Sequence, residues 1–293
     1  MSNKETGREI DDISGTETTG HEWDGIKELN TPLPRWWLWT FYVTIVWALA
    51  YTVAYPAWPL ISTNTKGLLG YSSRAEVAAE LAAAEAARGD IVAKIAATDL
   101  AEIRDDEELS RFAVAAGRSA YKVYCSQCHG SGAQGAPGYP NLNDDDWIWG
   151  GTIDEIHATI AHGVRYAADD DTRVSEMPAF GRDELLERDD IVAVAHFVRS
   201  LSDKEHDAAL ASAGQPVYAD NCAACHGEDG TGDITLGAPN LADAIWFYGD
   251  STEEIVAQIH APKHGVMPAW SERLGEATVK QLAVYIHSLG GGK

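Results

Sequence analysis

The residues with the most specific chemistry are the four cysteines, which all lie in two Cys-x-x-Cys-His segments. The first segment contains Cys125, Cys128 and His129, and the second contains Cys222, Cys225 and His226. Two thiols at this spacing can form thioether bonds with the two vinyl groups of one haem, and the next histidine can bind the iron. The sequence therefore predicts two covalently bound haem c groups, with His129 and His226 as axial ligands.

Besides the initiator, the chain has two methionines, Met177 and Met267, and each begins a Met-Pro-Ala-aromatic segment after a Cys-x-x-Cys-His segment. A methionine thioether on haem iron raises the reduction potential. We therefore predict Met177 and Met267 as the second axial ligands. Order along the chain favours pairing each methionine with the haem of its own half. Closely packed helical domains can exchange loops, so both pairings remain open.

The sequences around the two segments also repeat. Gly117 and Tyr121 recur 97 residues later as Gly214 and Tyr218; further pairs are Pro140-Asn141-Leu142 and Pro239-Asn240-Leu241, Trp149 and Trp246, His162-Gly163-Val164 and His264-Gly265-Val266, and Phe197 and Tyr285. Two copies of one unit are present. We expect two tandem, all-α, class-I-like cytochrome c domains, residues 111–204 and 205–293. Each would have a middle helix (153–162, 253–260) and a last helix (190–202, 277–289).

Other interpretations of the ligand-type residues are weaker. A lone Cys-x-x-Cys can be a redox dithiol or half a zinc site, and four cysteines can form one zinc ribbon. A ribbon would place the two pairs about 15–20 residues apart, whereas these two pairs begin 97 residues apart. Four further histidines near the haem loops could replace a methionine: His157, His162, His260 and His264. The repeated Met-Pro argues against that replacement.

One difference between the copies is a twelve-residue insertion, Arg165 to Glu176, that separates Val164 from Met177 and contains Asp169-Asp170-Asp171. In the second copy Val266 directly precedes Met267. This acidic loop could be a docking surface for a basic donor cytochrome or a surface insertion without a role.

The whole chain is strongly acidic, with 22 Lys and Arg against 45 Asp and Glu and a net charge of −23. Such a charge excludes nucleic acid as a natural partner. It suits a basic or dipolar protein partner attracted over long range, although solubility alone would explain it as well.

No charged residue lies between Trp36 and Pro59. A helix over residues 36–58 would be about 34 Å long, which is enough to cross a bilayer core, and Trp and Tyr cluster at both ends as in interfacial belts. The apolar stretch is too long for a signal peptide, and no clear cleavage site follows it. We therefore expect a retained transmembrane anchor.

Basic residues are equally few on both sides of the anchor, so the positive-inside rule does not orient it. Haem c attachment takes place outside the bacterial cytoplasmic membrane, which predicts periplasmic haem domains and a cytoplasmic tail of residues 1–35. Residues 1–22 are polar and are expected to be disordered. Residues 59–110 are expected to be a periplasmic helical linker, with a helix from Ser73 to about Arg88 interrupted at Gly89-Asp90.

A single anchor, a helical linker and two class-I-like haem c domains resemble the dihaem subunit III of cbb3-type cytochrome c oxidases. The most selective marks are Asp24-Gly25-Ile26, Glu28 and Pro32-x-Pro34-x-Trp36-Trp37. The segments 125–130 and 222–227, each ending in Cys-His-Gly, are shared by many cytochromes. The resemblance covers almost the whole chain from residue 21. Some members of the family have two membrane helices, whereas this sequence shows one.

The resemblance implies the electron-transfer subunit of a proton-pumping oxidase. Such a subunit accepts electrons from a soluble or anchored cytochrome c donor and passes them to the monohaem c subunit and then to the catalytic haem b and copper subunit. The chain itself is expected to have no oxygen-reduction site, since its span contains no histidine and His and Met together fill both axial positions. The alternatives are a free-standing anchored dihaem shuttle and the cytochrome subunit of a periplasmic dehydrogenase.

Overall fold

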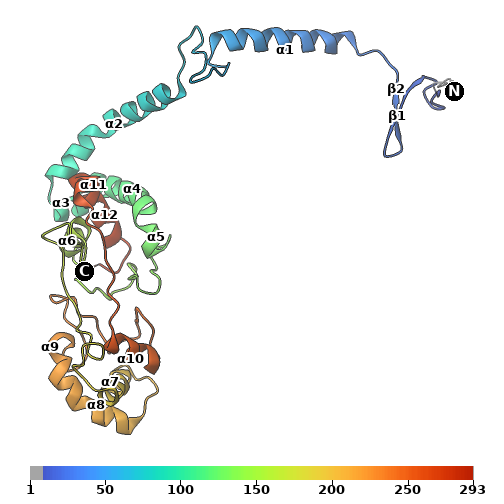
Figure 1. The fold of residues 1–293 in the computed structure, drawn as a ribbon. Helices are drawn as coiled ribbons and strands as arrows, with labels where there is room; N and C mark the ends of the chain where they lie inside the picture. The colour runs from blue at the N-terminus through green and yellow to red at the C-terminus, as the bar shows by residue number, and fades with distance from the viewer. Residues whose placement is uncertain (1–8, 293) are drawn as a thin grey trace. The chain divides into compact units, whose positions relative to one another are not determined.

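The computed structural model describes residues 9–292, and its regular elements are helices apart from one β-hairpin (Figure 1). It divides into two compact units, Met1–Glu85 and Ala86–Lys293, and the boundary falls inside helix α2 (Ser73–Ala97). The expected all-α class, with one apolar helix near the N-terminus, is confirmed.

The described part of the first unit contains a β-hairpin, which overlaps the segment expected to be disordered. Strands β1 (Thr18–Trp23) and β2 (Ile26–Leu29) pair antiparallel, and Asp24 and Gly25 between them have φ values of 51° and 84°. Positive φ at both central residues matches the twist of a two-residue hairpin turn. The expectation of disorder is therefore wrong for residues 18–22, and for residues 1–8 it lies outside the described part of the chain.

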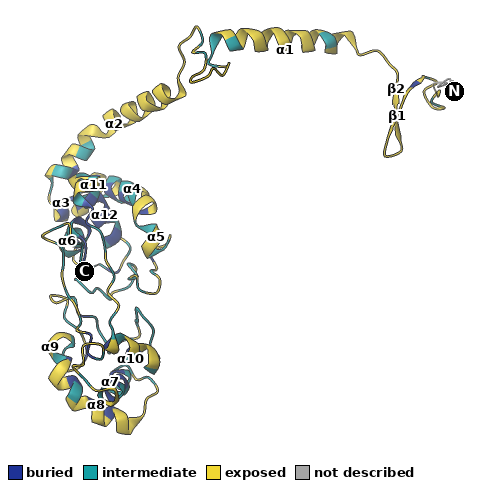
Figure 2. Cartoon of the chain, viewed as in Figure 1, coloured by how far each residue is buried: buried dark blue, intermediate teal, exposed yellow. Residues whose placement is uncertain are grey.

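Helix α1 (Arg35–Ala54) has 20 residues and a mean hydropathy of 1.4, and it is the one described helix long and apolar enough to span a membrane. It ends four residues before the expected end at Trp58, because Tyr55 precedes Pro56 and a proline disfavours helical geometry in the residue before it. The shorter helix still measures about 30 Å. Its side chains are exposed or half-buried along the whole length (Figure 2), as expected for a lipid-facing segment.

Helix α2 is continuous through Gly89, so the predicted interruption is wrong. The surrounding alanines have high helix propensity, and one glycine costs only about 1 kcal/mol against them. The last turn of α2 and helix α3 (Leu100–Asp105) bring Ile95, Leu100 and Ile103 into the core of the second unit. The end of the linker is thus part of the haem-binding body.

The second unit contains the repeated elements. In the first repeat they are α4 (Glu107–Tyr124), α5 (Ser126–His129), α6 (Ile153–His162) and α7 (Arg188–Leu201). In the second they are α8 (Ala208–Asn221), α9 (Ala223–His226), α10 (Thr252–His260), α11 (Ser271–Leu274) and α12 (Glu276–His287). The four middle and last helices match the predictions to within two residues. Equivalent capping boxes, Thr152 with Glu155 and Ser251 with Glu254, begin α6 and α10.

The two hydrophobic cores of this unit do not coincide with residues 111–204 and 205–293. Helix α12 packs on α4 and α6, whereas α7 packs on α8 and α10 (Figure 1). The first core therefore includes Val279, Leu282 and Ile286 from the end of the chain, and the second includes Ile191 and Val194 from the first repeat. Each repeat gives its last helix to the other repeat.

A repeated glycine permits each helix crossing. A Cβ added at Gly117 of α4 would overlap the carbonyl of Gln281 in α12, and one at Gly214 of α8 would overlap the carbonyl of Ala193 in α7. Aromatic pairs next to the crossings show the same exchange: Tyr121 lies 5.6 Å from Tyr285, and Tyr218 lies 5.0 Å from Phe197, between ring centroids.

These crossings make the glycines testable. Gly117→Ala and Gly214→Ala should each lower the free energy of unfolding by about 1–3 kcal/mol, because an added methyl overpacks a backbone contact. Gly89→Ala in α2 is the matched control, since nothing lies within 4 Å of its added Cβ, and it should be neutral or stabilising by about 0.5–1 kcal/mol. Circular dichroism during denaturation of the haem-loaded chain measures the free energy of unfolding of the crossing variants and of the control. Crossing variants as stable as the control would contradict the close approach.

Candidate haem sites

Each pair of cysteines lies at a short helix that directly follows a longer one. Cys125 and Cys222 cap the C-terminal ends of α4 and α8, and Cys128 and Cys225 lie in the four-residue helices α5 and α9. All four are free thiols; Cys128 and Cys225 are exposed. Burial, with a smaller effect of the neighbouring cysteine, raises the pKa of Cys125 and of Cys222 to about 11. The thiols of Cys125 and Cys222 in the unmodified chain are thus protonated at neutral pH.

The two histidines of the Cys-x-x-Cys-His segments are held in the orientation that iron ligation needs. Nδ1 of His129 lies 3.0 Å from the carbonyl oxygen of Pro140, and Nδ1 of His226 lies 3.0 Å from that of Pro239. An Nδ1–H that donates to a carbonyl leaves the Nε2 lone pair available for a metal. Burial lowers the pKa of both imidazoles, against the opposing effect of these hydrogen bonds, which favours the neutral, ligating form.

Two tyrosines fix the turns that follow these histidines. The hydroxyl of Tyr121 donates to the carbonyl of Gly130 at 2.7 Å, and that of Tyr218 donates to the carbonyl of Gly227 at 2.8 Å. Burial raises the pKa of Tyr121 to about 12 and raises that of Tyr218 as well. Both tyrosines therefore remain hydrogen-bond donors at physiological pH.

Both sets of ligand-type residues line one continuous cavity of about 430 Å³. Its walls include all four cysteines, both histidines and both methionines: Cys125, Cys128, His129, Met177, Cys222, Cys225, His226 and Met267. The walls are joined across the repeats, for example by the N–H of Gly138, which donates to the carbonyl of Phe247 at 2.7 Å. The two sites therefore belong to one body.

The methionines follow the exchanged helices. Met267 packs against the first core together with Cys125 and Leu142, and Met177 packs against the second core, which contains Cys222. Met267 and Val164 exchange backbone hydrogen bonds of 2.9 and 3.0 Å. This geometry favours Met267 for the haem of the first Cys-x-x-Cys-His segment and Met177 for that of the second. The order of the residues along the chain pointed weakly the other way.

One buried donor on the cavity wall fits the carboxylate of a haem propionate. The indole Nε1 of Trp246 lines the cavity and is buried without a hydrogen-bond partner among the described residues. Lys204 lies over the Trp246 ring, 6.0 Å from its centroid. A buried donor without a partner is costly, so an acceptor at this position is expected. The site thus accepts a haem with its thioethers, its axial ligands and an anionic edge.

Sequence reasoning missed three residues that hold the methionine loops. Gly163 has φ 71°, and an added Cβ would overlap the carbonyl of Met267. Arg165 donates to the carbonyls of Gly265 and Ser175, one in each methionine segment, and His264 accepts the backbone N–H of Met177. The repeated His-Gly-Val gave a signal for two of them, but their partners lie about a hundred residues away and could not be identified from the sequence.

These helical units, with a Cys-x-x-Cys-His turn, a carbonyl-anchored histidine and a methionine loop, define a c-type cytochrome. Residues 112–198 and 209–286 match the family model for cytochrome c oxidase, cbb3-type, subunit III. Residues 15–62 match the model for the N-terminal domain of cytochrome oxidase-cbb3, FixP.

The chain belongs to the subunit III family of cbb3-type cytochrome c oxidases. It is 57% identical over 286 residues to the cbb3-type cytochrome c oxidase subunit FixP of Sinorhizobium medicae, covering 98% of each chain. It is 52% identical over 276 residues to subunit CcoP of Cereibacter sphaeroides, covering 94% of this chain and 95% of that one. The resemblance seen in the sequence is confirmed, and with it haem c binding and a membrane-anchored oxidase subunit.

The partnerless indole leads to a prediction. Trp246→Phe keeps the ring but removes the N–H donor, so a propionate on that side loses compensation of its negative charge. The midpoint potential of the haem bound at Cys222 and Cys225 should fall, and that of the other haem should not change. Spectroelectrochemical titration measures both, with the exposed Trp58→Phe of the first unit as control. Equal shifts in the two tryptophan variants would contradict this role.

Proposed function

We propose that this chain relays electrons from a periplasmic cytochrome c to the oxygen-reducing subunits of a cbb3-type oxidase, with two haem c groups as carriers. The observation that carries the proposal is that two complete His and Met ligand sets line one cavity of a single body. When bound, each haem supplies a reversible one-electron couple, and the protein supplies ligation, burial and distance.

In this proposal the chain's own residues hold the carriers and keep other chemistry out. The four cysteines would form the thioethers, and the Nε2 atoms of His129 and His226 would bind iron because their Nδ1 atoms are held by carbonyls. The thioethers of Met177 and Met267 would be the second iron ligands. With His and Met both bound, neither iron would offer a position to oxygen, so we assign oxygen reduction and proton pumping to other subunits.

We further propose exchanged ligation, with His129 and Met267 on one iron and His226 and Met177 on the other. The exchanged cores and the Val164–Met267 backbone pairing support it. Each haem would then be enclosed by both repeats, which couples the two carriers mechanically and keeps them at a constant separation.

The exchange can be tested in chains that carry one haem. In a Cys222→Ala, Cys225→Ala chain, Met267→Ala should abolish the long-wavelength absorption band of methionine sulfur on ferric haem and allow carbon monoxide to bind. Met177→Ala in the same chain should leave that band intact. In the reciprocal Cys125→Ala, Cys128→Ala chain the two methionine variants should exchange their effects. The inverse pattern would establish ligation within each repeat.

The proposed topology places the predicted tail, residues 1–35, in the cytoplasm and the haem-binding body in the periplasm of a bacterial inner membrane. The charges of α1 do not orient it, because its one charged residue is Arg35 at the cytoplasmic end and none lies within the apolar stretch. The orientation therefore rests on the place where haem c is attached. The proposed partners are the catalytic haem b and copper subunit, the monohaem c subunit and a soluble or anchored donor cytochrome c. The net charge of −23 suits a donor with a basic face.

Extraction in mild detergent tests the assignment to an oxidase. The chain should migrate with haem b and copper and consume oxygen when reduced cytochrome c is supplied. The attachment variant Cys125→Ala, Cys128→Ala should lose most of this turnover while haem b and copper remain in the complex. If the chain instead migrates alone, it is a free-standing shuttle, and if it migrates with a dehydrogenase, electrons flow from that enzyme.

A further inference from the structure

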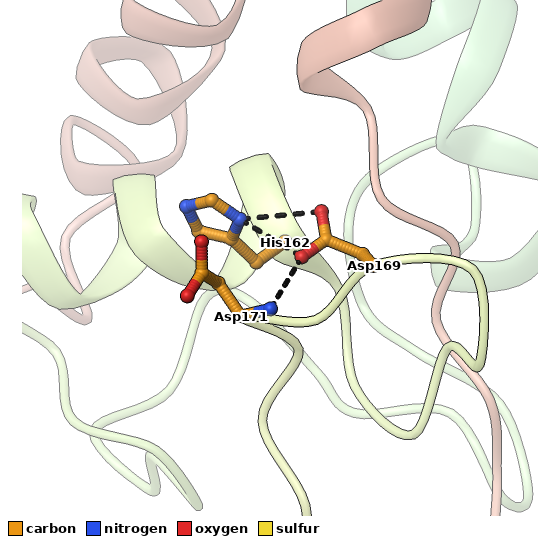
Figure 3. Close-up of side chains that lie close together, drawn as sticks. All are labelled: His162, Asp169 and Asp171. Atoms are coloured by element: carbon orange, nitrogen blue, oxygen red, sulfur yellow. Dashed lines mark hydrogen bonds and ion pairs between the residues drawn. The ribbon is translucent and has the colours of Figure 1, made fainter.

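The twelve-residue insertion of the first repeat folds back on itself beside the methionine loops. The backbone N–H of Arg165 donates to the carbonyl of Arg173 at 2.8 Å, and that of Arg173 donates to Gly163 at 3.2 Å. His162 at the end of α6 lies 3.2 Å from the carboxylate of Asp169, which also accepts from the backbone N–H of Asp171 at 2.9 Å (Figure 3). Asp169 is therefore an internal brace of the insertion rather than part of an open acidic surface.

The folded insertion orients Arg165 so that one side chain reaches both methionine segments. Its Nε donates to the carbonyl of Gly265 at 2.7 Å, and its Nη1 donates to the carbonyl of Ser175 at 2.9 Å. Gly265 lies two residues before Met267, and Ser175 lies two residues before Met177. The rigid guanidinium fork thus joins equivalent points of two loops that are far apart in sequence.

The backbone of Arg165 has the left-handed φ of 54°. A non-glycine residue adopts this conformation at a cost, and it persists only where the surroundings impose it. Here the constraint is the neighbouring Val164, whose N–H and carbonyl both pair with Met267. In return, His264 from the second repeat accepts the N–H of Met177 at 3.1 Å. Each methionine loop is thus held by residues of the other repeat.

The charge of Arg165 also reaches both sites. The guanidinium is half-buried, and burial lowers its pKa from the ordinary value, yet arginine stays protonated in proteins. It lines the same cavity as both methionines. Solvent and salt screen a partly buried charge poorly. A fixed positive charge at this place favours the electron-rich, reduced state of a group on either side.

We propose that Arg165 is a positioning residue shared by both haems: it holds the two axial methionine loops together and raises both reduction potentials. The inference rests on the exchanged ligation proposed above. It also assigns a role to the insertion, which carries the residue that the second repeat lacks.

The test is a series of variants of the full chain in its oxidase complex. Arg165→Gln should weaken the methionine–ferric band of both haems and shift both midpoint potentials downward together. Arg165→Lys keeps the positive charge but lacks the two-pronged guanidinium. Compared with Arg165→Gln, it should bring the midpoint potentials closer to wild type than it brings the methionine–ferric band. Arg118→Gln removes the same charge from the exposed face of α4 and should change neither.

Each other outcome is decisive. The shared role would be overturned if Arg165→Gln changed the midpoint potential of only one haem. It would also be overturned if the changes in potential equalled those of Arg118→Gln. If Arg165→Gln fails to assemble, Arg165→Lys decides alone: a band and potentials both equal to wild type would show that the fork is not needed. Met177→Ala and Met267→Ala, measured in parallel, separate this failure from that of the ligand assignment, because unchanged bands there would mean that the methionines are not ligands.

Discussion

The backbone pairing of Val164 with Met267 is the contact on which the arrangement of both haem sites depends. It joins the segment after α6 to the segment before α11, and it requires Gly163, because a side chain there would overlap the carbonyl of Met267. Because these two segments cross, the helix that follows each of them continues into the other repeat. Helix α12 therefore reaches α4, and α7 reaches α8. The proposed exchange of methionine ligands and the observed exchange of helices therefore have the same geometric cause.

This crossing makes a single body from what the sequence presents as two domains. The cores remain distinct, since each collects its own set of apolar side chains, but neither can form from one repeat alone. For the proposed electron carrier, the consequence would be a constant distance between its two haems, without reliance on a flexible linker. The membrane anchor is built differently: α1 lacks buried side chains in the described structure and depends on its surroundings for burial.

Much of the local structure follows from short-range patterns. The repeated sequence predicted α6, α7, α10 and α12 to within two residues, and the Cys-x-x-Cys-His spacing predicts the attachment residues. Errors arose where local rules compete. Gly89 did not interrupt an alanine-rich helix, Pro56 ended α1 earlier than hydropathy indicated, and Asp24-Gly25 formed a turn within a polar tail. At Pro56 and at Asp24-Gly25 a local backbone preference outweighed composition, whereas at Gly89 the alanine-rich composition outweighed the backbone preference of a single glycine.

The sequence by itself determined the chemistry of this protein: which side chains can bind haem c, how many sets there are, and that an apolar helix anchors them. These properties depend on residue type and on spacings within one or two turns, and both are visible in a linear chain. Only the tertiary structure decided which methionine lies beside which attachment site and what Arg165 connects. Two nearly identical repeats offer equivalent local surfaces for either pairing. The choice depends on whether the chain crosses at Gly163, and that is a contact between residues about a hundred positions apart.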